Sequence, residues 1–212
     1  MTRAMARKPQ QERSKATMQA IVEAGFISLQ THGLAQTTTR HIADIAGVGV
    51  GSLYEYFPNK EAVFKAMNAH LTTEIVAMVR ALMPSLVRLE IRPMVIRLLG
   101  HFRELLNRND GRYLKYAGFS MHAERSRQLE AIQQLLVELI MQYALHNPQL
   151  TRLRNLPVMS YIFIHGSVFT IIRHLSEPNS NISFEQLSEG LAEMIASYAE
   201  AELAKLDAAP RS

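Results

Sequence analysis

The stretch that decides the fold is AGVGVGSLYEYF, residues 46–57, in which glycines alternate with alanine and valine before a serine and two tyrosines. A dinucleotide-binding loop would need a strand before the glycines and a βαβ unit around them. The preceding TRHIADIA, residues 39–46, instead places its isoleucines three apart, which is a helical spacing, and no Gly-Lys-Ser or Gly-Lys-Thr follows. The run therefore predicts the turn and second helix of a helix-turn-helix rather than a nucleotide-binding loop.

The residues on both sides of this stretch indicate where the neighbouring helices begin and end. A helix over about 10–32 is expected to stop at Gly33, because glycine accepts the positive φ that ends helices. The hydroxyls of 37–39, Thr-Thr-Thr, are suited to cap the next helix, which breaks at 46–47. A second short helix runs to about residue 56, and Asn59 is placed to cap a long helix after it. This arrangement is that of a helix-turn-helix head.

The remainder of the chain has the three- and four-residue spacing of amphipathic helices, and no strand-like alternation persists. The apolar stripes predict helices over 64–82, 95–105, 129–143, 158–175 and 184–198, with Pro84 ending the first of them. The stretch 158–175 is apolar nearly all round, so it is expected to be covered on most sides. The sequence thus predicts an all-α protein of about nine helices, with a head over 1–58 and a larger helical domain over 59–212.

The charge of the chain is unevenly distributed. The 212 residues carry a net charge of +4, with a pI of about 9.5. Residues 1–60 hold seven Lys or Arg against four Asp or Glu, whereas 61–212 hold sixteen against fifteen. The excess in the first quarter favours an anionic partner there, either nucleic acid or a membrane surface, although a solvated basic tail has the same composition.

Several classes of protein lack support in the composition. The chain has no cysteine, and its eight histidines show no metal-binding spacing, so no metal site, cofactor or disulfide is expected. No Gly-x-Ser-x-Gly motif is present, and we predict that the protein is not an enzyme. The charged N-terminus has no apolar signal region, and the apolar stretch 158–172 is shorter than the roughly 18–20 residues of a bilayer span. A cytoplasmic protein without a membrane segment is expected.

Residues 13–64 resemble the DNA-binding domain of the TetR (tetracycline-repressor-like) transcriptional regulators. The matching stretches are IVEAGFISLQTHG, TTTRHIADIAGVGVGSLYEYF and PNKEAVF. The resemblance implies a homodimer, in which each head binds an operator in double-stranded DNA and the larger domain binds a small molecule and dimerises. It places the dimer interface on the helices near 158–175 and 183–206, and it implies that the ligand changes the spacing of the two heads and so releases DNA.

The resemblance also implies which side chains contact DNA. Arg40 would read guanine in the major groove, and Val50 could touch a thymine methyl. Tyr54, Tyr56 and Lys60 would bind phosphates, which set register and affinity. Lysine or another polar residue is usual in relatives where this chain has Val50, so one backbone contact is expected to be missing. The expected DNA-binding set is Thr38, Thr39, Arg40, Val50, Gly51, Ser52, Tyr54, Tyr56 and Lys60.

Aromatic residues with two histidines are the candidates for the effector site. Taken alone, each of them is better explained by ordinary core packing, but together they would fit a mostly apolar molecule with one or two hydrogen-bonding groups. The set is Phe102, Tyr113, Tyr116, Phe119, His122, Tyr143, Phe163, His165 and Phe169. Two other functions remain open, a DNA-binding dimer regulated by a protein partner and a helical carrier of small molecules with an incidental head.

Overall fold

The structure, a computed structural model, describes residues 7–122, 130–153, 155–176 and 181–208 of the 212-residue chain. Over these ranges it contains helices and no strand, which confirms the all-α prediction. The α-helices are α1 (Arg7–Gln36), α2 (Thr39–Ala46), α3 (Val50–Tyr56), α4 (Lys60–Leu86), α5 (Ile91–His122), α6 (Glu130–His146), α7 (Leu156–Ser176) and α8 (Phe184–Ala208), and a 3-10 helix, η2 (Pro148–Arg152), follows α6.

The first turns of the head follow the local chemistry of the sequence. Gly33 has a φ of 74° and a ψ of 171°, so the regular helix of α1 breaks at the glycine that was predicted to end it. Of the three threonines, Thr38 caps α2 by accepting a hydrogen bond from the amide of His41 at 3.2 Å. Thr37 is buried instead, and its hydroxyl donates to the Gly33 carbonyl at 2.8 Å. Helix α2 ends at Gly47, which is left-handed with a φ of 68°.

The long α4 begins as predicted and ends later than predicted. The Asn59 side chain accepts a hydrogen bond from the amide of Ala62 at 2.8 Å and so caps its first turn. Pro84 does not end the helix, because α4 continues through it to Leu86. Since Pro84 lies in the last turn, its missing N–H removes only one backbone hydrogen bond at that end.

Helix α5 is two helices joined by a left-handed break. Arg108 has an extended ψ of 154°, and Asn109, Asp110 and Gly111 have φ values of 52°, 59° and 73°. The helix predicted over 95–105 ends shortly before this break. Asparagine, aspartate and glycine are the residues that adopt positive φ most readily. The segment after the break returns to a helical conformation, which the sequence analysis did not anticipate.

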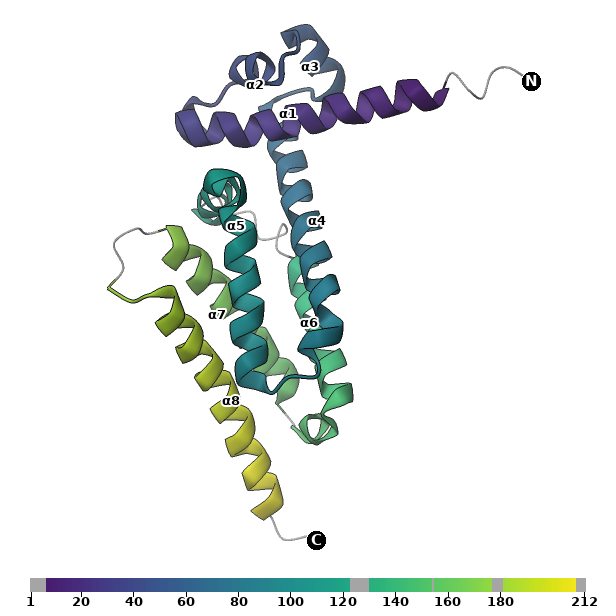
Figure 1. The fold of residues 1–212 in the computed structure, drawn as a ribbon. Coiled ribbons are helices and arrows are strands. Elements are labelled where there is room, and N and C mark those ends of the chain that lie inside the picture. Colours follow the sequence, from purple (N-terminus) through teal and green to yellow (C-terminus); the bar gives the residue numbers. More distant parts are fainter. Residues whose placement is uncertain (1–6, 123–129, 154, 177–180, 209–212) are drawn as a thin grey trace, which may run out of the picture.

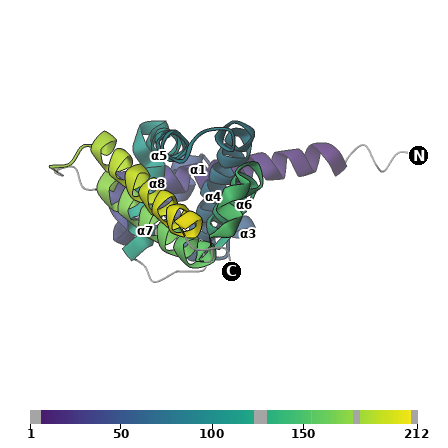
Figure 2. The same ribbon diagram turned by 90° about the horizontal axis from the view of Figure 1, so that it is seen from below.

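The elements form a head and a body (Figure 1). Helix α1 lies across one end of the molecule with α2 and α3 on its outer side, and α4 descends from the head into the body. Helices α4 and α5 pack against each other, α6 packs on α4, and α8 packs on α5 and α7. Seen from below, α7 and α8 lie together on one flank of the body, and α7 also contacts α6 (Figure 2). The boundary between 1–58 and 59–212 remains a prediction, and α4 begins just after it.

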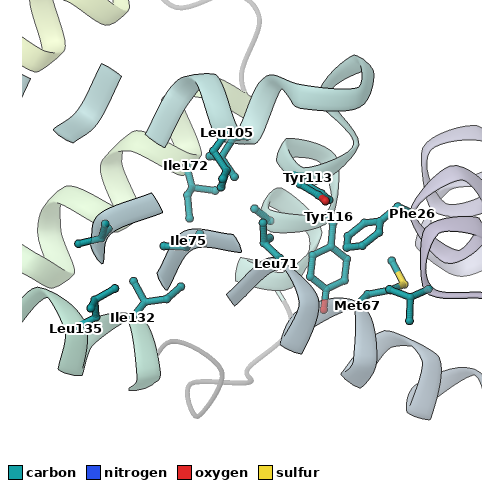
Figure 3. Packing of buried hydrophobic residues seen from close by; sticks show 14 of the residues in the cluster. Phe26, Met67, Leu71, Ile75, Leu105, Tyr113, Tyr116, Ile132, Leu135 and Ile172 are labelled. Atoms are coloured by element: carbon teal, nitrogen blue, oxygen red, sulfur yellow. The ribbon is translucent and has the colours of Figure 1, made fainter. Parts of the chain in front are cut away.

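The hydrophobic core runs without interruption from the head into the body. Phe26 of α1 packs edge-on against Tyr113 and Tyr116 of α5, with ring centroids 5.0 and 5.4 Å apart (Figure 3). The Tyr116 hydroxyl donates to the carbonyl of Phe64 in α4 at 3.0 Å. Met67 of α4 belongs to the same buried cluster. The head is therefore held to the body by packing on α4 and on the second half of α5.

An ionic cluster ties α8 to α5. Arg92 donates to Glu193 at 2.6 Å and to Glu200 at 3.0 Å, both on α8. The pKa of Glu193 is lowered from 4.5 to about 2. The main cause is the hydrogen bond from Arg92, and a hydrogen bond from Ser197 is the second cause. These groups are exposed, so the interaction is screened by salt.

Helix α7 has apolar surface on both sides. Of the described helices, it is long and apolar enough, by length and composition alone, to cross a membrane, with a mean hydropathy of 1.4. The helix extends beyond the apolar stretch 158–172 considered in the sequence analysis, and a single helix of this kind is not a clear membrane span. Its inner side packs in the core, but Val158, Tyr161, Ile162 and Phe169 are each more than half exposed in the single chain. Within a single copy of the chain, α7 is therefore not buried on most of its sides, as had been expected for 158–175.

We expect Gly47→Ala to lower the free energy of unfolding by about 1 kcal/mol, because a Cβ strains the left-handed conformation. Gly100→Ala is the matched control. Gly100 is inside α5 at ordinary φ, and a Cβ at this position would meet no other atom within 4 Å, so alanine there should stabilise by about 0.5–1 kcal/mol. Urea unfolding of both variants measures the difference, and equal effects would contradict the assigned conformation of Gly47.

We expect Arg92→Met to lower the urea midpoint at neutral pH, and the gap to the wild type to close in acid. The lowered pKa of Glu193 contributes stability that is fully present above about 4.5, its ordinary value, and is lost as the pH falls through about 2. Added salt should shrink the neutral-pH gap because the groups are exposed. A gap that stays constant from pH 7 to pH 2 would show that the arginine acts through packing alone.

Candidate DNA-binding face and effector cavity

Buried residues fix the orientation of α2 and α3 on the head. Ile42 and Leu53 are completely buried, and Phe57 is nearly so, which turns one side of each short helix toward the core. Helix α2 packs on α1 and on α3. The opposite side faces outward at the end of the molecule that is distant from the free end of α8 (Figure 1). Of the predicted DNA-binding residues, six are exposed: Thr38, Arg40, Val50, Gly51, Ser52 and Tyr54.

Tyr54 and Thr39 connect the two short helices. Their hydroxyls share a hydrogen bond of 3.1 Å, although they are fifteen positions apart in the chain. The Tyr54 side chain remains 49% exposed, so its hydroxyl is held in place and still open to a ligand. An oriented hydroxyl on an exposed helix face is suited to donate to a phosphate oxygen.

Tyr56 and Lys60 are less open than the other predicted residues. Tyr56 is half-buried and packs against the core. Lys60 is half-buried at the first turn of α4, with its Nζ 5.7 Å from the centroid of the Phe64 ring. The cationic head of Lys60 therefore lies beside the free N–H groups of a helix start, where anions are favoured.

The structure adds a pair of histidines that the sequence analysis did not identify. The rings of His32 in α1 and His41 in α2 stack with centroids 4.3 Å apart. His32 bonds to the Ser28 carbonyl at 3.1 Å through Nδ1, whereas Nδ1 of His41 is buried without a partner among the described residues. The two histidines lie on different helices and meet only when α1 and α2 pack together. Their spacing in the sequence therefore gives no sign of the contact.

A cavity of about 200 Å³ lies in the body, enclosed by α4, α5, α6, η2, α7 and α8. Its described lining contains no charged side chain, and most of it is aliphatic or aromatic. Four lining residues carry hydroxyls, namely Tyr143, Ser160, Ser167 and Tyr198. Such a cavity favours an apolar molecule and offers few hydrogen bonds to orient it.

Three of the predicted effector residues line this cavity: Phe102, Tyr143 and Phe163. The Tyr143 hydroxyl donates to the Leu89 carbonyl at 2.9 Å, and burial raises the pKa of Tyr143, so the phenol stays neutral at physiological pH. The Phe163 ring packs edge-on against Tyr198 with centroids 5.8 Å apart.

The other predicted effector residues lie elsewhere. Tyr113 and Tyr116 belong to the junction between head and body, where Tyr113 shares a 2.9 Å hydrogen bond with His70. Phe119 and Phe169 have exposed rings. His165 bonds to the Tyr161 carbonyl at 2.7 Å through Nδ1. The side chain of His122 lies outside the described residues.

The sequence analysis missed the aliphatic majority of the cavity wall. The same positions form the packing stripes of their helices, but a stripe does not say whether the space that it faces is filled or hollow. Typical members of the wall are Ile75, Met78, Leu98, Leu136, Leu139 and Ile195. The sequence marked these positions as apolar, and only the packing of the helices shows that they surround a hollow.

Residues 21–67 match the family described as "Bacterial regulatory proteins, tetR family". They form a TetR-family domain. The match covers α2, α3 and the flanking parts of α1 and α4, which are the elements that build the outward face. No curated protein matches the sequence.

Solved structures share the fold of the whole chain, including the body attached to the TetR-family head. The fatty acid degradation regulator FadR from Bacillus halodurans is 20% identical, with a TM-score of 0.67 over 84% of this chain and 94% of its own. The TetR family repressor AlkX from Dietzia sp. is 17% identical, with a TM-score of 0.57 over 88% and 96%. FadR from Thermus thermophilus, solved in complex with lauroyl-CoA, is 19% identical, with a TM-score of 0.51 over 92% and 97%.

Proposed function

We propose that this protein is a transcriptional repressor that binds a palindromic DNA operator as a homodimer and releases it when a small apolar molecule enters the body. The observation that carries the proposal is the outward face of α2 and α3. A hydroxyl pair, an exposed arginine and small residues lie together there, within the segment that matches the TetR family.

Phosphate binding is assigned to Tyr54, Lys60, Thr39 and Tyr56. Tyr54 supports this role through its exposure and its bond to Thr39, and Lys60 through its place at the start of α4. Arg40, Val50 and Ser52 are assigned to base edges, because they are exposed on the same face and Gly51 lets the backbone of α3 approach the groove. Thr38 caps α2, and in the proposed complex it lies close to the phosphates of the operator.

Dimerisation is assigned to α7 and α8. The outer side of α7 exposes Val158, Tyr161, Ile162 and Phe169, and α8 exposes Met194. A second copy that covers this side would remove the apolar surface from water, which is the main driving force of association. In such a dimer two heads can reach successive major grooves on one face of DNA, roughly 34 Å apart.

The effector is assigned to the cavity, whose described lining is apolar and uncharged. Structures of the same fold include a fatty acid degradation regulator and a complex with lauroyl-CoA, so this architecture accommodates apolar chains in other proteins. A ligand shifts the head spacing only if it binds the released state more tightly than the DNA-bound state.

The test of the proposed function is selection of bound duplexes from a random library. A palindromic consensus is expected, because it reports both the two-fold symmetry of a dimer and the bases that are read. Binding without sequence preference at low and at moderate salt would favour the helical carrier. A retained small molecule in native mass spectra would argue against regulation by a protein partner.

We expect Tyr54→Phe and Lys60→Gln to weaken operator binding in different ways. Loss of the tyrosine hydroxyl should cost about 1–2 kcal/mol, with little change in the salt dependence, since no charge is lost. Lys60→Gln should lower the slope of log affinity against log salt by about 1, because one fewer counterion is released. Thr73→Val, which removes an exposed hydroxyl on α4, is the control for Tyr54. Fluorescence anisotropy over a salt series measures both effects.

We expect Arg40→Ala to cost about 1–3 kcal/mol on the selected operator and to relax the preference at one base pair in each half-site. Arg80→Ala is the matched control, because Arg80 is exposed on α4 and lies 3.9 Å from Glu138, within the body. The readout is binding to the operator and to its single-base variants. Wild-type affinity and wild-type discrimination in the Arg40 variant would remove Arg40 from the base-reading set.

A further inference from the structure

The positive charge of the head lies in the first part of α1, residues 7–20, which we call the α1 arm. The arm has the sequence RKPQQERSKATMQA, with four basic residues and one acidic residue, and so a net charge of +3. Residues 21–60, which contain α2, α3 and the start of α4, hold two basic residues, Arg40 and Lys60, against three acidic ones. The excess charge of the first quarter is therefore not on the helices assigned to the operator.

The α1 arm also stands apart from the packed head. Between residues 11 and 20 no side chain is buried, and Ile21 is the first buried residue along the described part of α1. The match to the TetR family begins at the same position, residue 21. In both views α1 continues past α3 and α4 and projects beyond the rest of the molecule (Figures 1 and 2). The fourteen residues of the arm span about 21 Å of helix.

Two basic side chains of the α1 arm are free to meet a partner. Arg13 and Lys15 are exposed, and neither makes an ion pair with any residue that the structure describes. Several exposed arginines of the body instead pair with carboxylates, as Arg152 does with Asp207 at 2.8 Å. The α1 arm therefore carries positive charge that the fold itself does not neutralise, and this charge is complementary to a polyanion.

The composition of the α1 arm favours DNA over a membrane surface. A helix that lies in the lipid interface needs an apolar face with residues such as Trp, Phe or Leu. In the arm Met18 is the only large apolar residue, so it has no such face. Binding to DNA needs only cations that reach the phosphates. The arm also belongs to the same end of the molecule as the outward face of α2 and α3 (Figure 1).

We propose that the α1 arm binds the phosphate backbone of DNA beside the bases read by α2 and α3, with Arg13 and Lys15 as its phosphate-binding side chains. The inference rests on the proposed function in taking DNA as the partner, and it adds a surface outside the helix-turn-helix. Phosphate contacts carry no sequence information. The arm thus raises the affinity for any duplex, whereas Arg40 and α3 set the discrimination between sequences.

The test is the double variant Arg13→Gln, Lys15→Gln of the full chain, titrated by fluorescence anisotropy over a salt series. The duplexes are the operator recovered by selection, its single-base variants, and a mixed-sequence duplex of the same length. The slope of log affinity against log salt should fall by about 0.9 for each charge removed, so the deficit should grow about 3.5-fold per charge for every fourfold dilution of salt. The deficit should be the same on every duplex, and discrimination should stay at the wild-type level.

The matched control is the double variant Arg88→Gln, Arg97→Gln, which removes the same charge from the body. Arg88 lies between α4 and α5 and Arg97 lies on α5, and both are exposed without an ion pair among the described residues. This variant should keep the wild-type salt slope, and both double variants should keep the wild-type urea midpoint. Equal losses of affinity in the two variants would mean that only net charge matters, and would overturn the inference. A loss of affinity accompanied by a lower urea midpoint in the arm variant would assign the arm to the fold, and would also overturn it.

The remaining outcomes separate this inference from the proposed function. A wild-type salt slope in the arm variant would overturn the inference and leave the repressor intact. A reduced slope on the mixed-sequence duplex, in a protein that selects no DNA sequence, would support the arm and overturn the repressor. Binding to vesicles of phosphatidylserine and phosphatidylcholine that needs Arg13 and Lys15, with DNA binding unchanged in the variant, would assign the arm to a membrane surface and overturn the inference.

Discussion

The structure depends on one helix that belongs to the head and to the body at once. Helix α4 has 27 residues, which is about 40 Å of continuous hydrogen-bonded backbone. Val63 and Met67 near its start are completely buried in the core of the head, and Ile75, Met78 and Val79 farther along form part of the cavity wall. In our proposal, a displacement at the wall is carried along this helix to the end at which Lys60 stands.

A second attachment limits how the head can move. The left-handed break at 108–111 turns the second half of α5 so that Tyr113 and Tyr116 reach Phe26 of the head. Polar contacts reinforce the junction: Arg112 pairs with Glu23 of α1, and Gln30 donates to the Asp110 carbonyl at 2.8 Å. Because the head is held at two places, a change in the cavity that moves α4 relative to α5 is expected to rotate the head rather than to release it.

Helix α7 connects the proposed ligand site with the proposed dimer seam. One side of it lines the cavity with Ser160, Phe163 and Ile164, and another side exposes Tyr161 and Ile162 to solvent in the single chain. This explains why the segment is apolar nearly all round, a pattern that in isolation also satisfies the length and composition of a membrane span. Its surfaces face a cavity and, in our proposal, a second copy, and both require apolar side chains.

The sequence by itself determined the features that depend on neighbouring residues. The break of α1 at Gly33, the cap at Thr38, the left-handed Gly47 and the cap at Asn59 follow from local backbone preferences. The three- and four-residue stripes predicted the helices, and the motifs of 13–64 carried the resemblance of the head to the TetR family. Boundaries that depend on packing were misplaced. Helix α4 continues through Pro84 to Leu86, α5 resumes after its break, and α8 runs on to Ala208.

Only the tertiary structure decided which stripes meet around an empty space and which meet in a filled core. It placed Tyr113 and Tyr116 in the junction and Phe102, Tyr143 and Phe163 at the cavity, although all five are aromatic residues on amphipathic helices. The physical reason is that helical spacing reports which side of a helix is apolar, whereas the volume and the partners on that side depend on helices that are far apart in the chain.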